Sequence, residues 1–159
     1  SLIINGAPVG RELNKYAFSR NIPYDHDEGS CMIVIATDAP LSNRNLKRIA
    51  KRAIIGIGKV GGFASNGSGD YVIAFSTYKD ISGDNLTSKR TSVRNNAMTG
   101  LFQATVEATE EAIINSIFMA ESVSSSIGKS EALPINETLK ILKKYNSLNW
   151  NKELYPWKK

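Results

Sequence analysis

Two segments, the uninterrupted apolar run Met32–Ala36 and the largely apolar stretch Tyr71–Ser76, most constrain how this chain can fold. Continuous β-branched and apolar runs of this length are typical of strands that are buried on both faces. Between them, from Leu41 to Ile57, apolar residues recur every three or four positions, which predicts an amphipathic helix with Ser42 as its N-cap. Its inner positions are Leu46, Ile49, Ala50, Ala53, Ile54 and Ile57. Buried strands separated by amphipathic helices predict a layered α/β domain.

The outer side of this helix is basic, and its charged residues are Arg44, Lys47, Arg48, Lys51 and Arg52. We expect these side chains to form a solvated face, which is the usual role of charges on the outer side of an amphipathic helix. A binding surface for an acidic partner is the minority interpretation.

Other segments carry weaker signals. Asn5-Gly6, between two short apolar stretches, predicts a tight hairpin, and a short helix is expected near Glu12–Ala17, before an exposed loop. A long helix is predicted from Leu101 to Val123, and a last helix from about Asn136, its expected cap, to Tyr145. Residues 79–97 are polar and are expected to form an exposed excursion.

Length and residue counts exclude several classes of protein. A chain of 159 residues favours one domain, and it holds one cysteine, Cys31, and one histidine, His26. A zinc site built on Cys and His spacing and a disulfide framework are therefore excluded, and we predict neither a metal nor a cofactor. No run of 18 apolar residues occurs, and the first residues lack the pattern of a signal peptide, so no membrane partner is expected.

The net charge of +5 is concentrated near the C-terminus. Residues 140–159 contain six lysines and one glutamate, which accounts for the whole excess. Aromatic residues alternate with these lysines: Tyr145, Trp150, Tyr155 and Trp157. A solvated tail that packs its aromatics on protein is the favoured interpretation, and a nucleic-acid partner is the weaker alternative, which we do not predict.

One glycine motif formally matches a dinucleotide fingerprint. Gly56, Gly58 and Gly61 have the spacing GxGxxG, but that motif binds phosphate only where it follows a strand and opens a helix. Here it lies at the end of a predicted helix. We interpret it as a helix stop and a flexible loop.

Gly29-Ser30-Cys31 places two nucleophilic side chains directly before a predicted strand. His26 is the nearest base, but a histidine in an acidic loop without an orienting scaffold is more often a surface residue. An N-terminal Ser or Cys carries its own base, the α-amino group, with a pKa of about 7.7–8.0. Self-cleavage after Gly29 would create such a terminus. The alternative is an ordinary loop-to-strand boundary, where Gly and Ser are common.

Four longer segments carry a signal that is specific to one protein family: GSCMIVIATDAPL, LKRIAKRAIIGIGKVGG, NGSGDYVIAFST and LFQATVEATEEAIINSIFMAE. Together they resemble the L-aminopeptidase/D-amidase/D-esterase (DmpA) and β-peptidyl aminopeptidase family of self-processing N-terminal-nucleophile hydrolases. INGAPVGREL is similar to the family's sequence shortly before its processing site, and the resemblance extends to about Leu148. It implies a four-layer αββα sandwich of the α/β class, shared with ornithine acetyltransferase.

The resemblance also implies a set of site residues. Cleavage would occur at Gly29-Ser30, and Ser30 rather than Cys31 would be the nucleophile, with its new α-amine as base. Ser68 and Asp70 match the family's supporting serine and acid. Their implied roles are to orient the nucleophile or its amine and to stabilise the positive charge there.

The implied activity is that of a serine aminopeptidase or amidase that releases N-terminal L-, D- or β-aminoacyl residues from peptides, amides or esters. Residues 1–29 would end the family's α segment, 30–148 would form the β chain of the same domain, and 149–159 a basic aromatic tail. The oxyanion-hole asparagine is expected upstream of Ser1, so the chain is expected to be a piece of a longer precursor.

The implied partners are a small peptide or aminoacyl amide substrate, the missing α segment and further α/β pairs in a homo-oligomer. The compartment stays open, with the cytoplasm favoured over the periplasm. Two alternatives remain: an acyltransferase like ornithine acetyltransferase, whose nucleophile is threonine, and a non-catalytic protein that retains the fold.

Overall fold

The computed structural model describes residues 1–13, 29–79, 83–84, 87–88, 91–126, 128–149 and 151–154, with backbone alone at 83–84, 87–88 and 154. The chain divides into two compact units. The sheet unit comprises residues 27–58 and 64–110. The terminal unit comprises residues 1–26, 59–63 and 111–159.

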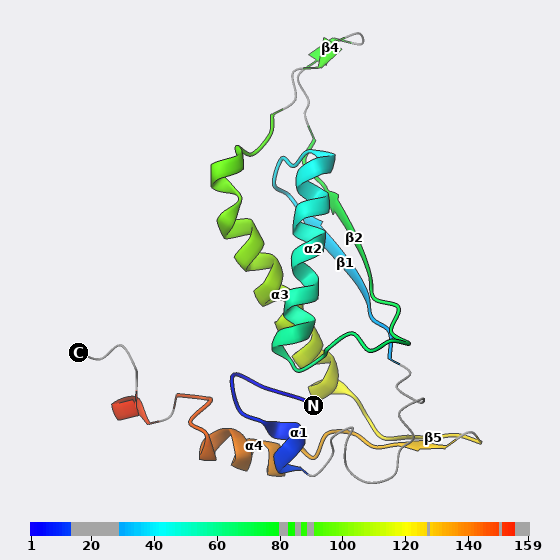
Figure 1. Cartoon of the computed structure of the whole chain (residues 1–159), viewed down its shortest axis with the longest axis vertical. Coiled ribbons are helices and arrows are strands. Elements are labelled where there is room, and N and C mark those ends of the chain that lie inside the picture. The colour runs from blue at the N-terminus through cyan, green and yellow to red at the C-terminus, as the bar shows by residue number, and fades with distance from the viewer. Residues whose placement is uncertain are drawn as a thin grey trace. The chain divides into compact units, whose positions relative to one another are not determined.

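The sheet unit is built on two parallel strands joined by a helix (Figure 1): β1 (Met32–Thr37), α2 (Asn43–Lys59) and β2 (Tyr71–Ser76). All three predicted elements are confirmed. The strands pair in register from Met32↔Tyr71 to Thr37↔Ser76. The predicted N-cap of α2, Ser42, is confirmed, because its Oγ accepts a hydrogen bond from the Asn45 N–H at 3.4 Å.

The prediction that both strands are buried on two faces is wrong for this chain. Exposure alternates along each strand, with Met32 at 64% and Tyr71 at 64%. We call the exposed side the open apolar face, and its large members are Met32, Val34, Tyr71, Ile73 and Phe75. The opposite side is half-buried. A parallel sheet needs cover on both faces, and the described residues supply it on one.

The basic side of α2 is also less solvated than predicted. The guanidinium groups of Arg48 and Arg52 lie over the ring of Phe102, 4.9 and 4.0 Å from its centroid. Arg48 also donates hydrogen bonds to Asn45 and Asn95 at 3.0 and 2.8 Å. These two arginines are cation–π partners of the next helix. Of the five charged residues of the predicted basic side, Arg44, Lys47 and Lys51 are exposed.

The glycines of the GxGxxG match have structural roles. Gly56 and Gly58 lie inside α2, so the predicted helix stop comes later, at Lys59, and Gly61 with φ +94° follows it. Gly56 is buried where α2 meets α3 (Thr99–Met119), since a Cβ there would lie 2.7 Å from the Thr109 Cβ.

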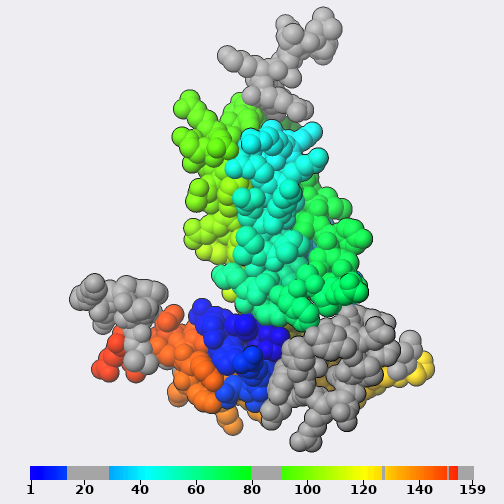
Figure 2. All heavy atoms as spheres, viewed as in Figure 1, coloured from blue at the N-terminus to red at the C-terminus, as the bar shows by residue number. Residues whose placement is uncertain are grey.

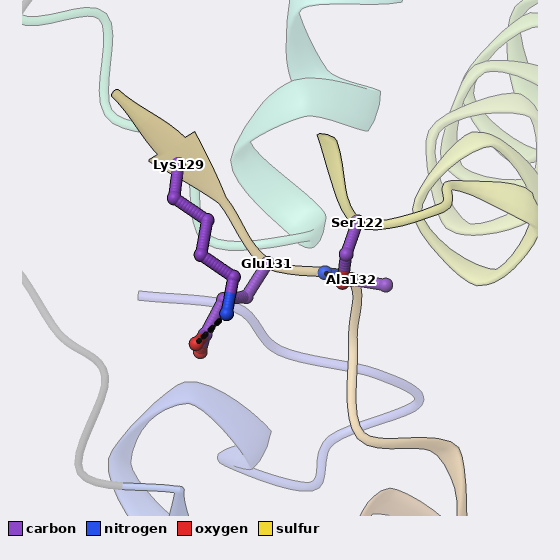
Figure 3. Close-up of polar contacts among 4 residues, drawn as sticks. All are labelled: Ser122, Lys129, Glu131 and Ala132. Carbon is purple, nitrogen blue, oxygen red and sulfur yellow. Dashed lines mark hydrogen bonds and ion pairs between the residues drawn. The ribbon is translucent and has the colours of Figure 1, made fainter. Parts of the chain in front are cut away.

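Helix α3 is shorter than predicted at its C-terminal end. It ends at Met119, and Val123 belongs instead to a short hairpin of β5 (Val123–Ser124) and β6 (Lys129–Ser130). One polar contact joins the two arms of this hairpin (Figure 3): the Ala132 N–H donates to Ser122 Oγ at 2.9 Å. On one arm, Lys129 pairs with Glu131 at 3.4 Å. The sequence pattern did not predict these strands.

The polar excursion predicted over 79–97 contains short structure. β3 (Gly83–Asp84) pairs antiparallel with β4 (Thr87–Ser88), and a 3₁₀ turn, η2, spans Asn95–Ala97. A second such turn, η3, spans Lys152–Leu154. Of the predicted tail, Trp150, Tyr155 and Trp157 lie outside the described residues.

In the terminal unit the predicted hairpin is confirmed. Ile4 pairs with Ala7 across Asn5 and Gly6, whose φ values of 44° and 82° are those of a tight primed turn. The helix that follows, α1 (Val9–Glu12), begins earlier than the predicted Glu12–Ala17, whose end lies outside the described residues.

This hairpin packs on the last helix, α4 (Ile135–Lys144), and Figure 2 shows the two in contact. Their shared core is formed by Ile4, Ala7, Val9, Ile141 and Leu142. The predicted cap Asn136 is wrong: Pro134 is the N-cap residue and no side chain caps the helix.

An ion pair closes the edge of this core. Glu12 accepts hydrogen bonds from Lys144 and from the Tyr145 hydroxyl, both at 2.7 Å. The hydrogen bond from Lys144, and then that from Tyr145, lowers the pKa of Glu12. The same contact with Glu12 raises the pKa of Lys144 and of Tyr145.

Within the described part of the chain, no helix has the length and apolar character needed to span a membrane.

Alanine at two helical glycines should have opposite effects. Gly56→Ala places a methyl group 2.7 Å from Thr109 Cβ and 2.9 Å from the Val106 carbonyl oxygen, so we expect the free energy of unfolding to fall by about 1–3 kcal/mol. The matched control is Gly58→Ala, which meets nothing within 4 Å and should raise it by about 0.5–1 kcal/mol. Urea denaturation of the full-length protein measures both. Equal effects would contradict the helix contact.

Candidate functional site

The parallel register brings two loops together at one edge of the sheet. Ser30 lies two residues before the start of β1, Asp70 lies directly before β2, and Ser68 lies three residues before β2. Because Met32 is paired with Tyr71, the residues that precede the two strands are neighbours. The Tyr71 N–H extends the pairing by donating to the Cys31 carbonyl oxygen at 2.9 Å.

The Asp70 carboxylate connects these loops. One oxygen, Oδ1, accepts a hydrogen bond from the Cys31 N–H at 2.9 Å, and the other, Oδ2, accepts one from the Ser68 hydroxyl at 2.9 Å. Asp70 therefore fixes the backbone directly after Ser30 and holds the side chain of Ser68. Three of the predicted residues, Ser30, Ser68 and Asp70, thus meet in one place.

Sequence reasoning missed one group at this site, the backbone amide of Gly69. Its N–H donates a hydrogen bond to Ser30 Oγ at 3.1 Å. Gly69 lies between the two predicted residues Ser68 and Asp70, and that position was the available signal. The direction of an amide is not encoded in residue type, so the sequence could not assign this contact.

The two adjacent nucleophilic residues differ in environment. Gly29 and Ser30 are exposed, whereas Cys31 is half-buried with a free thiol. Consecutive residues leading into a strand point to opposite faces, so Ser30 belongs with the open apolar face and Cys31 with the covered one. An exposed hydroxyl that accepts a hydrogen bond is the better placed of the two to meet a substrate.

His26, the alternative base, lies outside the described residues. Among the residues with described positions, no group of three or more His, Cys, Asp or Glu side chains could hold a metal ion. The chemistry available at the described site is that of two hydroxyls, a carboxylate and backbone amides.

A cavity of about 500 Å³ opens at the other end of the two strands. It is lined by residues that follow β1 and end β2, among them Pro40, Leu41, Ser76 and Tyr78. Ser30 precedes the first residue of β1, so this cavity lies at the opposite edge of the sheet and cannot hold the group that Ser30 would attack.

Comparison with protein families and known proteins gives a consistent result. A model of peptidase family S58 matches residues 1–130. The β-peptidyl aminopeptidase BapA of Sphingosinicella microcystinivorans is 41% identical over 161 residues, which cover 92% of this chain and 40% of that protein. The chain therefore spans about two fifths of the length of that relative.

Two solved structures are similar in fold. The L-aminopeptidase D-Ala-esterase/amidase of Ochrobactrum anthropi, described as a variant of the Ntn-hydrolase fold, matches with a TM-score of 0.76 and 31% identity, over 92% of this chain and 40% of that one. A β-aminopeptidase of Burkholderia sp. matches with a TM-score of 0.74 and 33% identity, over 90% and 40%. The family resemblance stated from the sequence is confirmed.

Two substitutions should distinguish the contribution of the Asp70 hydrogen-bond acceptors from that of its negative charge. Asp70→Ala removes the acceptors of the Cys31 N–H and the Ser68 hydroxyl, so we expect the free energy of unfolding to fall by about 1–3 kcal/mol and the Cys31 amide to exchange faster. Asp70→Asn keeps an oxygen for the Cys31 N–H and should retain slow exchange. Hydrogen exchange and urea denaturation of the full-length protein test this, and fast exchange in Asp70→Asn would contradict the assigned bond.

Proposed function

Because this chain belongs to peptidase family S58, we propose that it carries the nucleophile of a self-processing serine aminopeptidase or amidase. The enzyme would release N-terminal L-, D- or β-aminoacyl residues from peptides, amides or esters. The observation that carries the proposal is the meeting of Ser30 with Ser68, Gly69 and Asp70 at one sheet edge. This activity would belong to the whole precursor. The present chain spans about two fifths of the length of its relatives.

Self-cleavage would create the active nucleophile. Ser30 Oγ attacks the Gly29 carbonyl carbon; the C–O bond forms, the Gly29–Ser30 C–N bond breaks, and the hydroxyl proton passes to the departing amine. Water then hydrolyses the ester. The products are a Gly29 carboxylate and a free Ser30 with both hydroxyl and α-amine.

The released amine would act as the base in turnover. With a pKa of about 7.7–8.0, an α-amine is partly deprotonated near neutral pH, and that fraction can accept a proton. It takes the Oγ proton as Ser30 attacks the carbonyl of the substrate's N-terminal residue, and it returns that proton to the leaving amine. Water hydrolyses the acyl-enzyme and restores Ser30.

Ser68 and Asp70 would position this machinery. Asp70 holds the Cys31 amide, and so limits how far Ser30 can move, while its negative charge favours the protonated form of the Ser30 amine. Ser68, whose hydroxyl donates to the other carboxylate oxygen, would orient the same amine. No metal and no cofactor take part in this mechanism.

The open apolar face is evidence for the remaining layers of the proposed fold. Five large apolar side chains of two parallel strands are 44–65% exposed there, which is typical of a surface that another layer covers. We assign that layer to a second sheet supplied by the missing α segment. The result is the four-layer αββα sandwich, with the oxyanion-hole asparagine upstream of Ser1 and several α/β pairs in one oligomer.

The proposed cut would divide the chain after Gly29, and the family resemblance extends to about Leu148. Residues 1–29 would end the α chain, 30–148 would form the β chain, and 149–159 its basic tail. Residues 1–13 would then be held by α4 of the other chain without a covalent link, through their shared core and Glu12.

Intact-mass spectrometry of the full-length protein tests the proposal. We expect a cut between Gly29 and Ser30 that Ser30→Ala abolishes and that the matched variant Cys31→Ala retains. An aminoacyl amide assay, run beside an acetyl donor with ornithine, should show hydrolysis and no acetyl transfer. An uncut wild-type protein without hydrolase activity would leave the non-catalytic alternative. Acetyl transfer to ornithine would favour the transferase.

The contact of Glu12 with Lys144 and Tyr145 should make retention of the processed N-terminal piece depend on pH. A carboxylate whose pKa is lowered in the folded state stabilises the fold above its unfolded value, and this effect is lost as pH falls below about 4.5 and through the lowered pKa. Native mass spectrometry of the cut protein should therefore show that the wild type loses the piece as pH falls through this window. Glu12→Gln, which cannot ionise, should retain less of the piece above the window and show no transition within it. Identical profiles would show that the apolar core alone holds the piece.

A further inference from the structure

The Gly69 N–H touches the proposed reacting atom directly, and none of the roles given above uses it. The amide nitrogen lies 3.1 Å from Ser30 Oγ, within hydrogen-bond distance, and the N–H is the donor. We propose that the Gly69 amide is a catalytic hydrogen-bond donor that stabilises negative charge on Ser30 Oγ during self-cleavage and acyl transfer. This inference rests on the proposed function of Ser30 as the nucleophile.

The amide is held in place before any reaction begins. The Asp70 carboxylate fixes both sides of it, since it accepts from the Ser68 hydroxyl before Gly69 and from the Cys31 N–H across the sheet edge. The Ser68 N–H donates to the Ser65 carbonyl oxygen at 2.9 Å, which sets the turn that leads into it. A donor fixed in this way needs no reorganisation when charge develops, and such donors give the largest electrostatic effects in catalysis.

Charge develops on Oγ at two stages of each reaction. As Ser30 attacks, Oγ gives up its proton, and the N–H stabilises the partial alkoxide. When water later hydrolyses the ester, Oγ is the leaving atom and again carries negative charge until it takes back a proton. The same donor therefore serves the ester of the self-cleavage and the acyl-enzyme of turnover, and its removal should slow both.

The space around Gly69 permits a matched pair of replacements. A Cβ at Gly69 would lie 3.2 Å from Tyr71 Cε2 and 3.5 Å from Ser30 Oγ, so alanine requires only a small shift of an exposed tyrosine ring. Its φ is outside the left-handed region. Gly69→Ala keeps the N–H. L-lactate at the same position has the same side chain but an ester oxygen in place of the N–H.

The experiment compares these two full-length proteins, with lactate incorporated at residue 69 by nonsense suppression. We expect lactate to slow self-cleavage, followed by intact mass, and kcat for an aminoacyl p-nitroanilide by about 100-fold or more relative to Gly69→Ala. Melting temperatures identify any variant that fails to fold. In that case Gly69→Pro, which also lacks the N–H, replaces it and should show the same loss.

The outcomes separate the two proposals. If the wild type cuts itself and turns over substrate, but lactate at residue 69 stays within about threefold of Gly69→Ala in both reactions, the amide is not a catalytic donor and the proposed function survives. If neither the wild type nor Gly69→Ala is cut or active, the proposed function fails, and this inference with it.

Discussion

The parallel pairing of β1 with β2 is the interaction on which the site depends. In a parallel pair both strands begin at the same edge, so the loops that lead into them converge whatever their separation in sequence. The register Met32↔Tyr71 sets Cys31 beside Asp70 and Ser30 beside Gly69. A slip of one residue would turn every side chain of the strand to the other face and would break all of these contacts.

The elements of the sheet unit could be predicted because each one has a dense local signal. Apolar runs define β1 and β2, and a repeat of three and four defines α2. Burial was harder to predict. The apolar runs indicate strands covered on two faces, whereas Val34 and Ile73 are 65% and 56% exposed. A sequence records what a strand needs in the complete fold, and this chain spans about two fifths of the length of its relatives.

Other features depend on contacts that the sequence pattern does not contain. The glycine motif predicts a helix stop, yet Gly56 lies within α2. Its glycine is explained by the approach of α3, which leaves no room there for a Cβ. Asn136 has the chemistry of a cap but lies in the first turn of α4, after Pro134 has already started the helix. At the site, the resemblance supplied Ser30, Ser68 and Asp70. The contact of the Gly69 amide could not be predicted, because every residue except proline has a backbone N–H and its direction is set only by the fold.

In the proposed mechanism, the Asp70 carboxylate would have opposite effects on the two charges that Ser30 would carry. A protonated Ser30 amine is favoured by a nearby carboxylate, whereas an alkoxide on the same residue is disfavoured by it. Both Asp70 carboxylate oxygens accept hydrogen bonds, one from the Cys31 N–H and one from the Ser68 hydroxyl. These donors offset part of the negative electrostatic potential of the carboxylate. The Gly69 N–H donates to Oγ itself and, in the proposed mechanism, would oppose the remainder where the alkoxide would form. One short segment, Ser68-Gly69-Asp70, would thus favour a cation on the amine and an anion on the oxygen of a single serine.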